Sequence, residues 1–182
     1  MTTISTSLNN PLKVSWIAAP WPGQLGLTIA PGKQGQAPKL RHERDLGTDF
    51  AALKQEDVTL LVNLMEADEQ RRWGMAAYPA EAHRAGLNTL AFPIPDVSVP
   101  ADPDAFAALV EQLHTRLQDG QRVVVHCLGG LGRSGTLAAC LLIRAGQPNP
   151  DEAIRTVRSF RPGAVEADQP QFVRTYAARL NA

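Results

Sequence analysis

The amino-acid sequence predicts an α/β fold in which a central, largely parallel sheet is flanked by helices. Short apolar runs of strand length alternate with longer segments that repeat apolar residues at helical spacing, and the chain closes with helices. Residues 58–64 form a continuous apolar run, as expected for a strand buried on both faces. We expect one domain over residues 14–182, preceded by a loose polar lead-in at residues 1–13.

The first half of the chain supplies the first predicted elements. Residues 14–17 and 25–29 read as short strands, because a turn-rich segment with two prolines and a glycine separates them. Residues 31–38 contain two prolines and two glycines and read as a loop. Residues 45–55 repeat apolar side chains at helical spacing and are predicted to form a helix.

Several later elements carry their own start and stop signals. Asp102 is a typical N-cap and Pro103 a typical first helical residue, and Gly120 follows the end of that helix. Residues 123–127 are rich in valine and read as a short strand. The remaining predictions are helices at 66–73, 79–85, 102–118, 134–145, 150–160 and 170–180, and a strand at 87–94.

Composition narrows the class of protein. Eighteen basic residues balance eighteen acidic ones, which argues against a general nucleic-acid or membrane-surface binder. Cys127 and Cys140 are too few for a disulfide framework. Residues 1–10 do not resemble a signal peptide, and the longest apolar run, residues 137–143, is too short to span a bilayer. We therefore expect a cytoplasmic, reducing location and no membrane partner.

The segment between the predicted strand at 123–127 and the helix at 134–145 carries the predicted chemistry. Its three glycines allow successive backbone N–H groups to point inward, and the following helix adds its N-terminal end. Together they predict a concave anion site between Cys127 and Arg133. The predicted substrate-binding residues within it are Leu128, Gly129, Gly130, Leu131 and Gly132.

Each polar residue of this segment has a predicted role. A ring of N–H groups and a helix dipole favour the thiolate of Cys127, which makes it a nucleophile. Arg133 can hold two phosphate oxygens, and Ser134 is expected to donate a hydrogen bond to the sulfur when it leaves. His126 is expected to shape the loop from beneath. A lone cysteine at a strand end is more often a small buried hydrophobe, but the combination His-Cys-five residues-Arg-Ser favours catalysis.

These residues also carry a resemblance. His126-Cys127-x5-Arg133-Ser134 resembles the signature of the cysteine-dependent protein tyrosine and dual-specificity phosphatase superfamily, and the longer string through Leu142 resembles its kinase-associated phosphatase group. Weaker counterparts extend the resemblance to roughly residues 14–180; they lie at residues 25–33, 49–53, 92–96 and 161–165. The resemblance implies a protein tyrosine phosphatase-like fold and hydrolysis through a cysteinyl-phosphate intermediate without a cofactor.

A phosphatase of this type needs a general acid, and Asp96 is the candidate. It lies in a proline-stiffened loop after a predicted strand and precedes Cys127 by 31 positions, a separation similar to that of the family's acid loop. An ordinary surface aspartate in a turn is the alternative. Asp102 and Asp104 are rivals, but an N-cap and a first-turn charge describe them better.

The resemblance also implies a residue that orients the hydrolytic water. Glu166 stands where many relatives carry a glutamine, and Gln169 matches a second one with a spacing that differs by one, so Gln171 stays an alternative. No histidine pair has ligand spacing and Cys140 is expected in the core, so no metal site is predicted. Lys33 has no predicted role.

The loop interior contains no lysine, which favours a single phosphate on a protein side chain over a polyphosphorylated ligand. The predicted function is a protein phosphatase that hydrolyses phosphotyrosine, with phosphoserine and phosphothreonine as further candidates. The predicted partner is thus a phosphorylated protein. The alternatives are a phosphatase of small phosphorylated metabolites or inositol phosphates and, from another class, a non-catalytic phospho-binding module. The sequence leaves the oligomeric state open.

Overall fold

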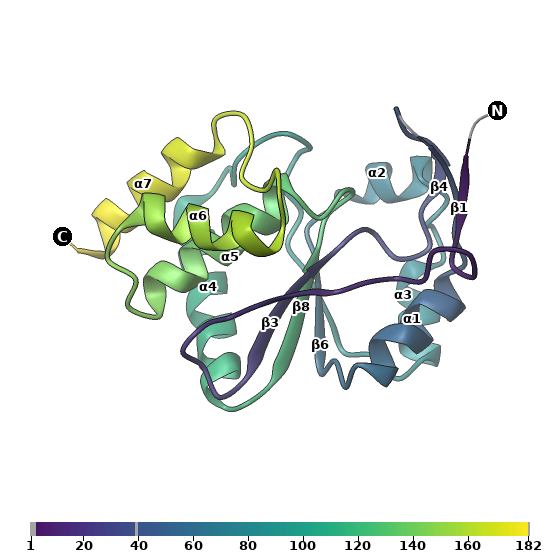
Figure 1. The fold of residues 1–182 in the computed structure, drawn as a ribbon, viewed down its shortest axis with the longest axis horizontal. Helices are drawn as coiled ribbons and strands as arrows, with labels where there is room; N and C mark the ends of the chain where they lie inside the picture. The colour runs from purple at the N-terminus through teal and green to yellow at the C-terminus, as the bar shows by residue number, and fades with distance from the viewer. Residues whose placement is uncertain (1–2, 39, 182) are drawn as a thin grey trace.

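A five-stranded sheet runs through the middle of the molecule in the computed structural model, which describes residues 3–38 and 40–181 (Figure 1). The strand order is β2-β3-β8-β6-β7, in which β2 and β3 are antiparallel and every other pair is parallel. The predicted α/β fold with a largely parallel sheet is therefore confirmed. The strands are β2 Ser15–Ile17, β3 Gln24–Thr28, β6 Leu60–Asn63, β7 Thr89–Ala91 and β8 Arg122–His126.

Side chains of the central strands alternate between two hydrophobic clusters, one on each face of the sheet. On β8, Val123 and Val125 join the larger cluster, whereas Val124 joins the smaller one. Neighbouring β6 repeats this pattern, since Val62 belongs to the larger cluster and Leu61 to the smaller. All these side chains are buried, which explains why the sequence of both strands is apolar without alternation.

Helices cover both faces of the main sheet. Figure 1 shows α4 to α7 on one side and α1 to α3 on the other. Asp102 caps α4 by accepting hydrogen bonds from the N–H groups of Asp104 and Ala105, and Asn149 caps α6 in the same manner. The helices are α1 Leu46–Gln55, α2 Ala67–Arg72, α3 Tyr78–Arg84, α4 Pro103–Gln118, α5 Gly132–Arg144, α6 Pro150–Phe160 and α7 Gln169–Leu180.

A second, three-stranded sheet was not predicted. It consists of β1 Ile4–Thr6, β5 Arg41–Glu43 and β4 Gln34–Gln36 in that order. The expectation of a loose lead-in is therefore wrong for residues 4–6, because β1 pairs with β5. The expectation of a plain loop at 31–38 is also wrong, because β4 lies within it.

Two boundaries near the predicted anion site also differ from expectation. Helix α5 begins at Gly132, two residues before the predicted start, so Arg133 and Ser134 lie in its first turn. Strand β7, at Thr89–Ala91, is shorter than the predicted strand at 87–94. No helix among the described residues has the length and apolar character required to span a membrane.

Candidate active site

The loop between β8 and α5 lies at the carboxyl end of the main sheet. Strand β8 is central and pairs in parallel with β3 on one side and β6 on the other. In this register His126 is opposite both Thr28 and Asn63, so the three strands end at one level. Cys127 follows directly. Ligand sites of parallel sheets form at this edge, where loops leave neighbouring strands.

The carbonyl groups of the loop are held by groups outside it. The carbonyl of Leu128 accepts hydrogen bonds from the N–H of Ala30 at 3.1 Å and from Lys33 Nζ at 3.3 Å. Arg161 donates from Nη2 to the carbonyl of Gly129 at 2.9 Å and from Nε to that of Gly130 at 3.1 Å. In a trans peptide the C=O and the following N–H point in opposite directions. The N–H groups of residues 129–131 therefore face away from these partners, toward the inside of the loop.

Gly130 is the glycine that this loop conformation requires. Its φ is +65°, in the left-handed region that side chains disfavour. A Cβ atom added there would lie 2.1 Å from the carbonyl oxygen of Thr28 at the end of β3. The loop thus packs directly against the neighbouring strand at this position.

Cys127 and Ser134, the predicted nucleophile and its hydrogen-bond donor, are both buried. Cys127 has 3% of its surface exposed. The Ser134 hydroxyl makes no hydrogen bond with any of the described residues, so its predicted contact with the sulfur stays a prediction. Cys140 lies in the middle of α5, where complete burial raises the pKa of its thiol well above the usual value. The two buried cysteines thus lie in different elements, Cys127 in the loop after β8 and Cys140 in α5.

His126 lies beneath the loop, at the position from which it is predicted to act. Its Nδ1 is 3.2 Å from the carbonyl oxygen of Cys127, and its Nε2 is 2.7 Å from the hydroxyl of Tyr78. Burial lowers the pKa of His126 to about 4, so the ring is neutral near pH 7. With the single ring proton on Nδ1, His126 donates to Cys127 and Tyr78 donates to Nε2. Tyr78 was not predicted from the sequence.

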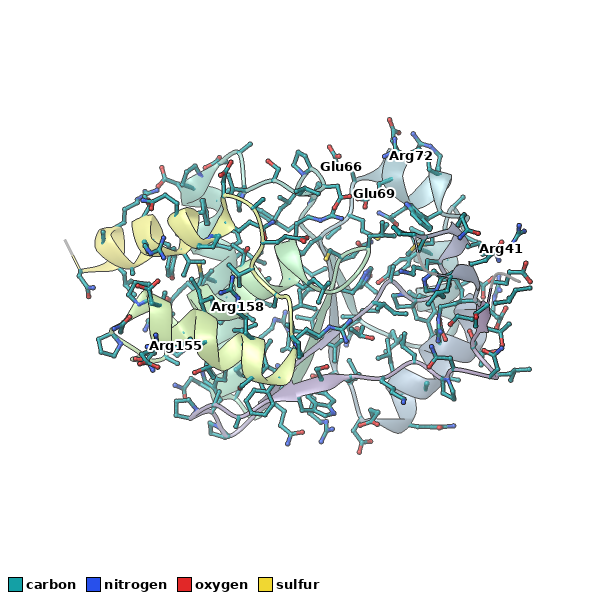
Figure 2. The ribbon with its side chains drawn as sticks, turned by 45° about the horizontal axis from the view of Figure 1, so that its top comes forward. Arg41, Glu66, Glu69, Arg72, Arg155 and Arg158 are labelled. Carbon is teal, nitrogen blue, oxygen red and sulfur yellow. The ribbon has the colours of Figure 1, made fainter. Side chains whose placement is uncertain are left out.

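Arg133 is buried and held by a carboxylate that sequence reasoning missed. Its Nη1 and Nη2 donate to the two carboxylate oxygens of Glu69 on α2 at 2.7 and 2.8 Å. Nη1 also donates to the carbonyl of Ile94 at 3.0 Å. Glu69 lies toward the middle of the molecule, whereas Arg72 of the same short helix lies at its edge (Figure 2). A bidentate pair of this kind fixes the guanidinium plane.

Asp96, in the connection between β7 and α4, contacts the same arginine. Its Oδ1 accepts hydrogen bonds from Arg133 Nη2 at 2.8 Å and from the N–H of Val97 at 3.0 Å, and 55% of its side chain is exposed. Val97 has a φ of +53°, which is strained for a β-branched residue. Of the rivals, Asp102 caps α4 and Asp104 pairs with Arg179. Asp96 is thus the aspartate that meets the loop.

Gln169 and Glu166 lie against the last glycine of the loop. A Cβ atom added at Gly132 would meet Glu166 Oε1 at 2.6 Å and Gln169 Oε1 at 2.9 Å. The Gln169 amide accepts from the N–H of Glu166 and donates to the carbonyl of Ser98, each at 2.9 Å. Gln171 is exposed and lines a separate groove beside α7. Of the two glutamines, only Gln169 is adjacent to the loop.

The segment that carries Glu166 is itself held in place by α6. Arg158 donates from Nε and Nη2 to the carbonyls of Ala164 and Val165 at 2.9 and 2.7 Å. Val165 in turn donates its N–H to the carbonyl of Leu131 at 3.3 Å. This connection therefore supports the loop from the side of α6.

The described residues contain no group of three or more His, Cys, Asp or Glu side chains arranged to hold a metal ion. The polar groups around Cys127 are instead donors, namely loop N–H groups, Arg133 and the helix terminus. They can bind a tetrahedral anion beside a sulfur atom.

Comparison with known proteins identifies the family. The sequence model of the family described as "Polymorphic toxin system, DSP-PTPase phosphatase" matches residues 37–147, which include Asp96, Cys127 and Arg133. The chain belongs to this family. It is a dual-specificity-type, cysteine-dependent protein phosphatase, and therefore a hydrolase.

Relatives of this phosphatase agree with that assignment. It is 29% identical over 161 residues to "Cyclin-dependent kinase inhibitor 3" of Sus scrofa, a match that covers 86% of this chain and 74% of the relative. The human protein of the same name is 36% identical over 85 residues, which cover 46% of this chain and only 40% of that protein. The predicted resemblance to the kinase-associated phosphatase group is confirmed.

Solved structures show the same fold. A kinase-associated phosphatase whose catalytic-site cysteine is substituted by serine superposes with a TM-score of 0.85 at 26% identity, covering 95% of this phosphatase and 98% of that chain. The active form of Tk-PTP gives a TM-score of 0.70 at 25% identity, with coverage of 91% and 97%. The predicted protein tyrosine phosphatase-like fold is therefore confirmed.

Proposed function

We propose that this phosphatase removes a single phosphate from a protein side chain, with Cys127 as the nucleophile and the loop of residues 127–133 as the phosphate-binding site. The observation that carries the proposal is the orientation of the loop. Its carbonyls are held outside by Lys33, Ala30 and Arg161. Its N–H groups are thereby left to face a tetrahedral anion beside Cys127.

The reaction proceeds in two displacements. The Cys127 thiolate attacks phosphorus, a P–S bond forms, and the bond between phosphorus and the side-chain oxygen of the substrate breaks while Asp96 gives that oxygen a proton. Water then attacks the cysteinyl-phosphate and loses a proton to Asp96, and the P–S bond breaks to release inorganic phosphate. Ser134 stabilises the departing thiolate, since its buried hydroxyl is free of other partners among the described residues.

Arg133 stabilises the phosphoryl group in both displacements. The Glu69 pair and the Ile94 carbonyl orient the guanidinium, so it needs no reorganisation during the reaction. Asp96 accepts a hydrogen bond from Nη2. A bound phosphate would take this donor together with Nε–H and release Asp96 toward the leaving oxygen.

Gln169 and Glu166 are proposed to orient the hydrolytic water. Both side chains reach the last loop glycine, on the side where water must approach once the substrate alcohol has departed. The Gln169 amide also bridges to the carbonyl of Ser98 in the acid loop. This hydrogen bond links the proposed water site to the segment that carries Asp96.

The proposed substrate is a phosphorylated protein, with phosphotyrosine first and phosphoserine and phosphothreonine as further candidates. The names of the relatives, a kinase-associated phosphatase and a cyclin-dependent kinase inhibitor, support a phosphoprotein substrate. The loop interior carries no lysine for extra phosphates. A reducing, cytoplasmic setting is proposed as well, because a reactive thiolate must escape oxidation.

A substrate panel tests this function. Wild-type protein is expected to turn over phosphotyrosine peptides faster than inositol phosphates, and Cys127→Ser is expected to lose at least roughly 10³-fold in kcat. Cys140→Ser is the matched control, since this thiol is buried away from the loop, and its kcat should stay near wild type. Retained turnover in Cys127→Ser would refute the mechanism, and a preference for inositol phosphates would refute the substrate class.

A further inference from the structure

Lys33 is a buried cation for which the phosphatase reaction described above gives no role. It follows Gly32, which has a φ of +70° in the left-handed region that favours glycine. Only 5% of its surface is exposed. Its ammonium donates to the carbonyl of Leu128, the residue that follows Cys127, and lies 5.7 Å from the centre of the Trp73 ring. A long, fully charged side chain is seldom buried unless it has a partner.

The charges around this ammonium leave Cys127 as its anionic partner. Cys127 raises the pKa of Lys33 whereas Arg44 and Arg161 lower it, and among the described residues Lys33 makes no ion pair with a carboxylate. His42 also faces it, but burial lowers the pKa of His42 to about 4, so the ring is neutral near pH 7. Burial lowers the pKa of Lys33 to about 8, while Cys127 acts in the opposite direction. A nearby anion favours the charged form of a buried cation, and Lys33 contacts Leu128, the residue next to Cys127.

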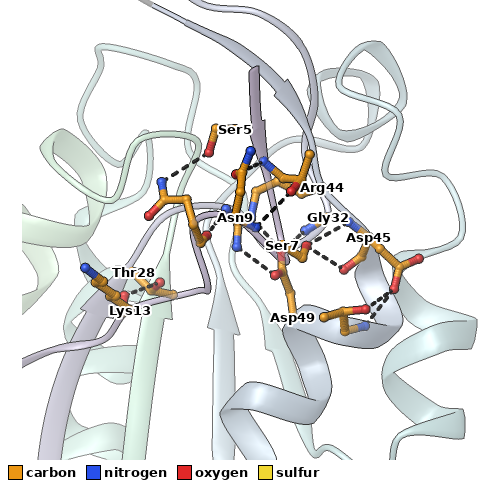
Figure 3. A network of polar contacts seen from close by, with 12 residues as sticks. Ser5, Ser7, Asn9, Lys13, Thr28, Gly32, Arg44, Asp45 and Asp49 are labelled. Carbon is orange, nitrogen blue, oxygen red and sulfur yellow. Dashed lines mark hydrogen bonds and ion pairs between the residues drawn. The ribbon is translucent and has the colours of Figure 1, made fainter. Parts of the chain in front are cut away.

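The backbone around Lys33 is anchored by a buried ion pair (Figure 3). Arg44 donates to both oxygens of Asp49, from Nε at 2.8 Å and from Nη2 at 2.7 Å. Asp49 also accepts from the N–H of Gly32 at 2.8 Å. The N–H of Arg44 donates to the carbonyl of Lys33 at 3.3 Å. Because Asp49 neutralises Arg44, this network fixes the position of Lys33 without supplying a counter-charge to it.

We propose that Lys33 is a positioning residue for the reaction: its ammonium stabilises the Cys127 thiolate from behind the loop and holds the Leu128 carbonyl outward, so that the N–H of Gly129 faces the phosphate. The proposal rests on the proposed function, in which Cys127 reacts as a thiolate. Lys33 does not touch the substrate. The second sheet gains a role from this proposal, because β4 directly follows Lys33 and β5 directly precedes Arg44, whose N–H holds the Lys33 carbonyl.

The pH dependence of Cys127 alkylation by iodoacetamide tests the electrostatic part. Lys33→Met keeps the length of the side chain and removes its charge. The midpoint pH of the reaction is expected to rise by about one unit, so that alkylation below the midpoint slows about tenfold. Lys13→Met, which removes an exposed lysine, should leave the midpoint unchanged. Lys33→Arg keeps the positive charge, so its midpoint should stay close to that of the wild type. An unchanged midpoint in folded Lys33→Met would overturn the proposal.

A second measurement does not depend on the folding of a Lys33 variant. In Cys127→Ser the anionic partner is removed, and by linkage the pKa of Lys33 should fall below its wild-type value. Lysine side-chain carbon NMR, with Lys33 assigned through bonds to its own backbone, measures both values, and equal values would overturn the proposal. A wild-type alkylation midpoint near that of an ordinary thiol, about pH 8.5, would instead contradict the thiolate mechanism itself.

Discussion

At the scale of single residues, the proposed role of Asp96 requires two arrangements, one charged and bound to Arg133 and one protonated and directed at the substrate. Its carboxylate accepts from Arg133 and from the N–H of Val97, contacts that suit a charged carboxylate. Donation of a proton requires the protonated form, directed at the substrate oxygen. The strained φ of Val97 lies at the residue where the loop would have to adjust between these arrangements.

Asp96→Asn should therefore slow the chemistry and alter its pH dependence. We expect kcat on a phosphopeptide to fall roughly 10²-fold or more, because the alkoxide or phenoxide must leave without a proton. The alkaline limb of the kcat–pH profile should disappear, since no acid remains to be deprotonated. An aryl phosphate with a good leaving group should be affected less. Steady-state kinetics over a range of pH measures these changes.

Asp102→Asn is the matched control for this prediction. It makes the same chemical change six positions along the chain, and asparagine caps a helix about as well as aspartate, so kcat and its pH profile should be unchanged. If Asp102→Asn reproduced the loss, or if Asp96→Asn kept the wild-type profile, Asp96 would not be the acid.

The sequence revealed Cys127, Arg133 and Asp96 because motif spacing and loop chemistry mark them. It did not reveal Glu69 or Lys33, although both touch the site. Glu69 lies in a short charged helix that resembles any solvated one, and it becomes buried only because α2 packs over Arg133. No local pattern records that tertiary contact.

At the scale of elements, the connection between β8 and α5 is built by its neighbours. The carbonyls of residues 128–130 are held by Lys33 from the β3 side and by Arg161 from the end of α6. Thr28 at the end of β3 leaves no space beside Gly130. The loop thus takes its shape from β3 and α6 as well as from its own glycines.

Gly130→Ala should damage both the loop and the activity. The new methyl group would lie 2.1 Å from the carbonyl oxygen of Thr28, in addition to the cost of a φ of +65°. A displacement of the loop by about 1 Å would lower kcat/KM roughly 10²-fold. Gly86→Ala is the control for the steric clash. Gly86 has a similar φ of +68°, but a Cβ atom added there would have no other atom within 4 Å.

Urea unfolding and steady-state kinetics of both glycine variants separate the two effects. Gly86→Ala should lose roughly 1–2 kcal/mol of stability and retain its activity. Gly130→Ala should lose more stability and most of its activity. Equal losses in the two variants would show that the contact with β3 is unimportant.

The sequence predicted the elements that have a continuous apolar run or a clear helix cap. Strands β6 and β8 are buried runs, and α4 and α6 begin with a cap followed by proline. Strands β1, β4 and β5 are three residues each and mostly polar, so they carry no such signal. They form because segments that are distant in the sequence pair with one another. A local sequence pattern contains no information about such pairing.

At the scale of the whole molecule, buried histidines link stability to pH. His42, His114 and His126 are buried, and burial lowers the pKa of each in the folded protein. For His42 and His126 the folded pKa is about 4, against 6.5 in the unfolded chain. Between these values the unfolded state binds more protons than the native state. The free energy of unfolding must therefore fall as the pH drops from about 6.5 to about 4, and the contribution is fully present above 6.5.

His42→Gln should flatten this acid-side loss of stability. His42 lies in β5, distant in sequence from the loop, and its Nδ1 has no hydrogen-bond partner among the described residues. Without His42, the chain takes up one proton fewer when it unfolds in this pH range. The slope of the unfolding free energy against pH between 6.5 and 4 should therefore decrease by up to about 1.4 kcal/mol per pH unit. Urea unfolding at a series of pH values gives the slope. His83→Gln removes an exposed histidine and should keep the wild-type slope; if both variants behaved alike, the burial of His42 would not explain the pH dependence.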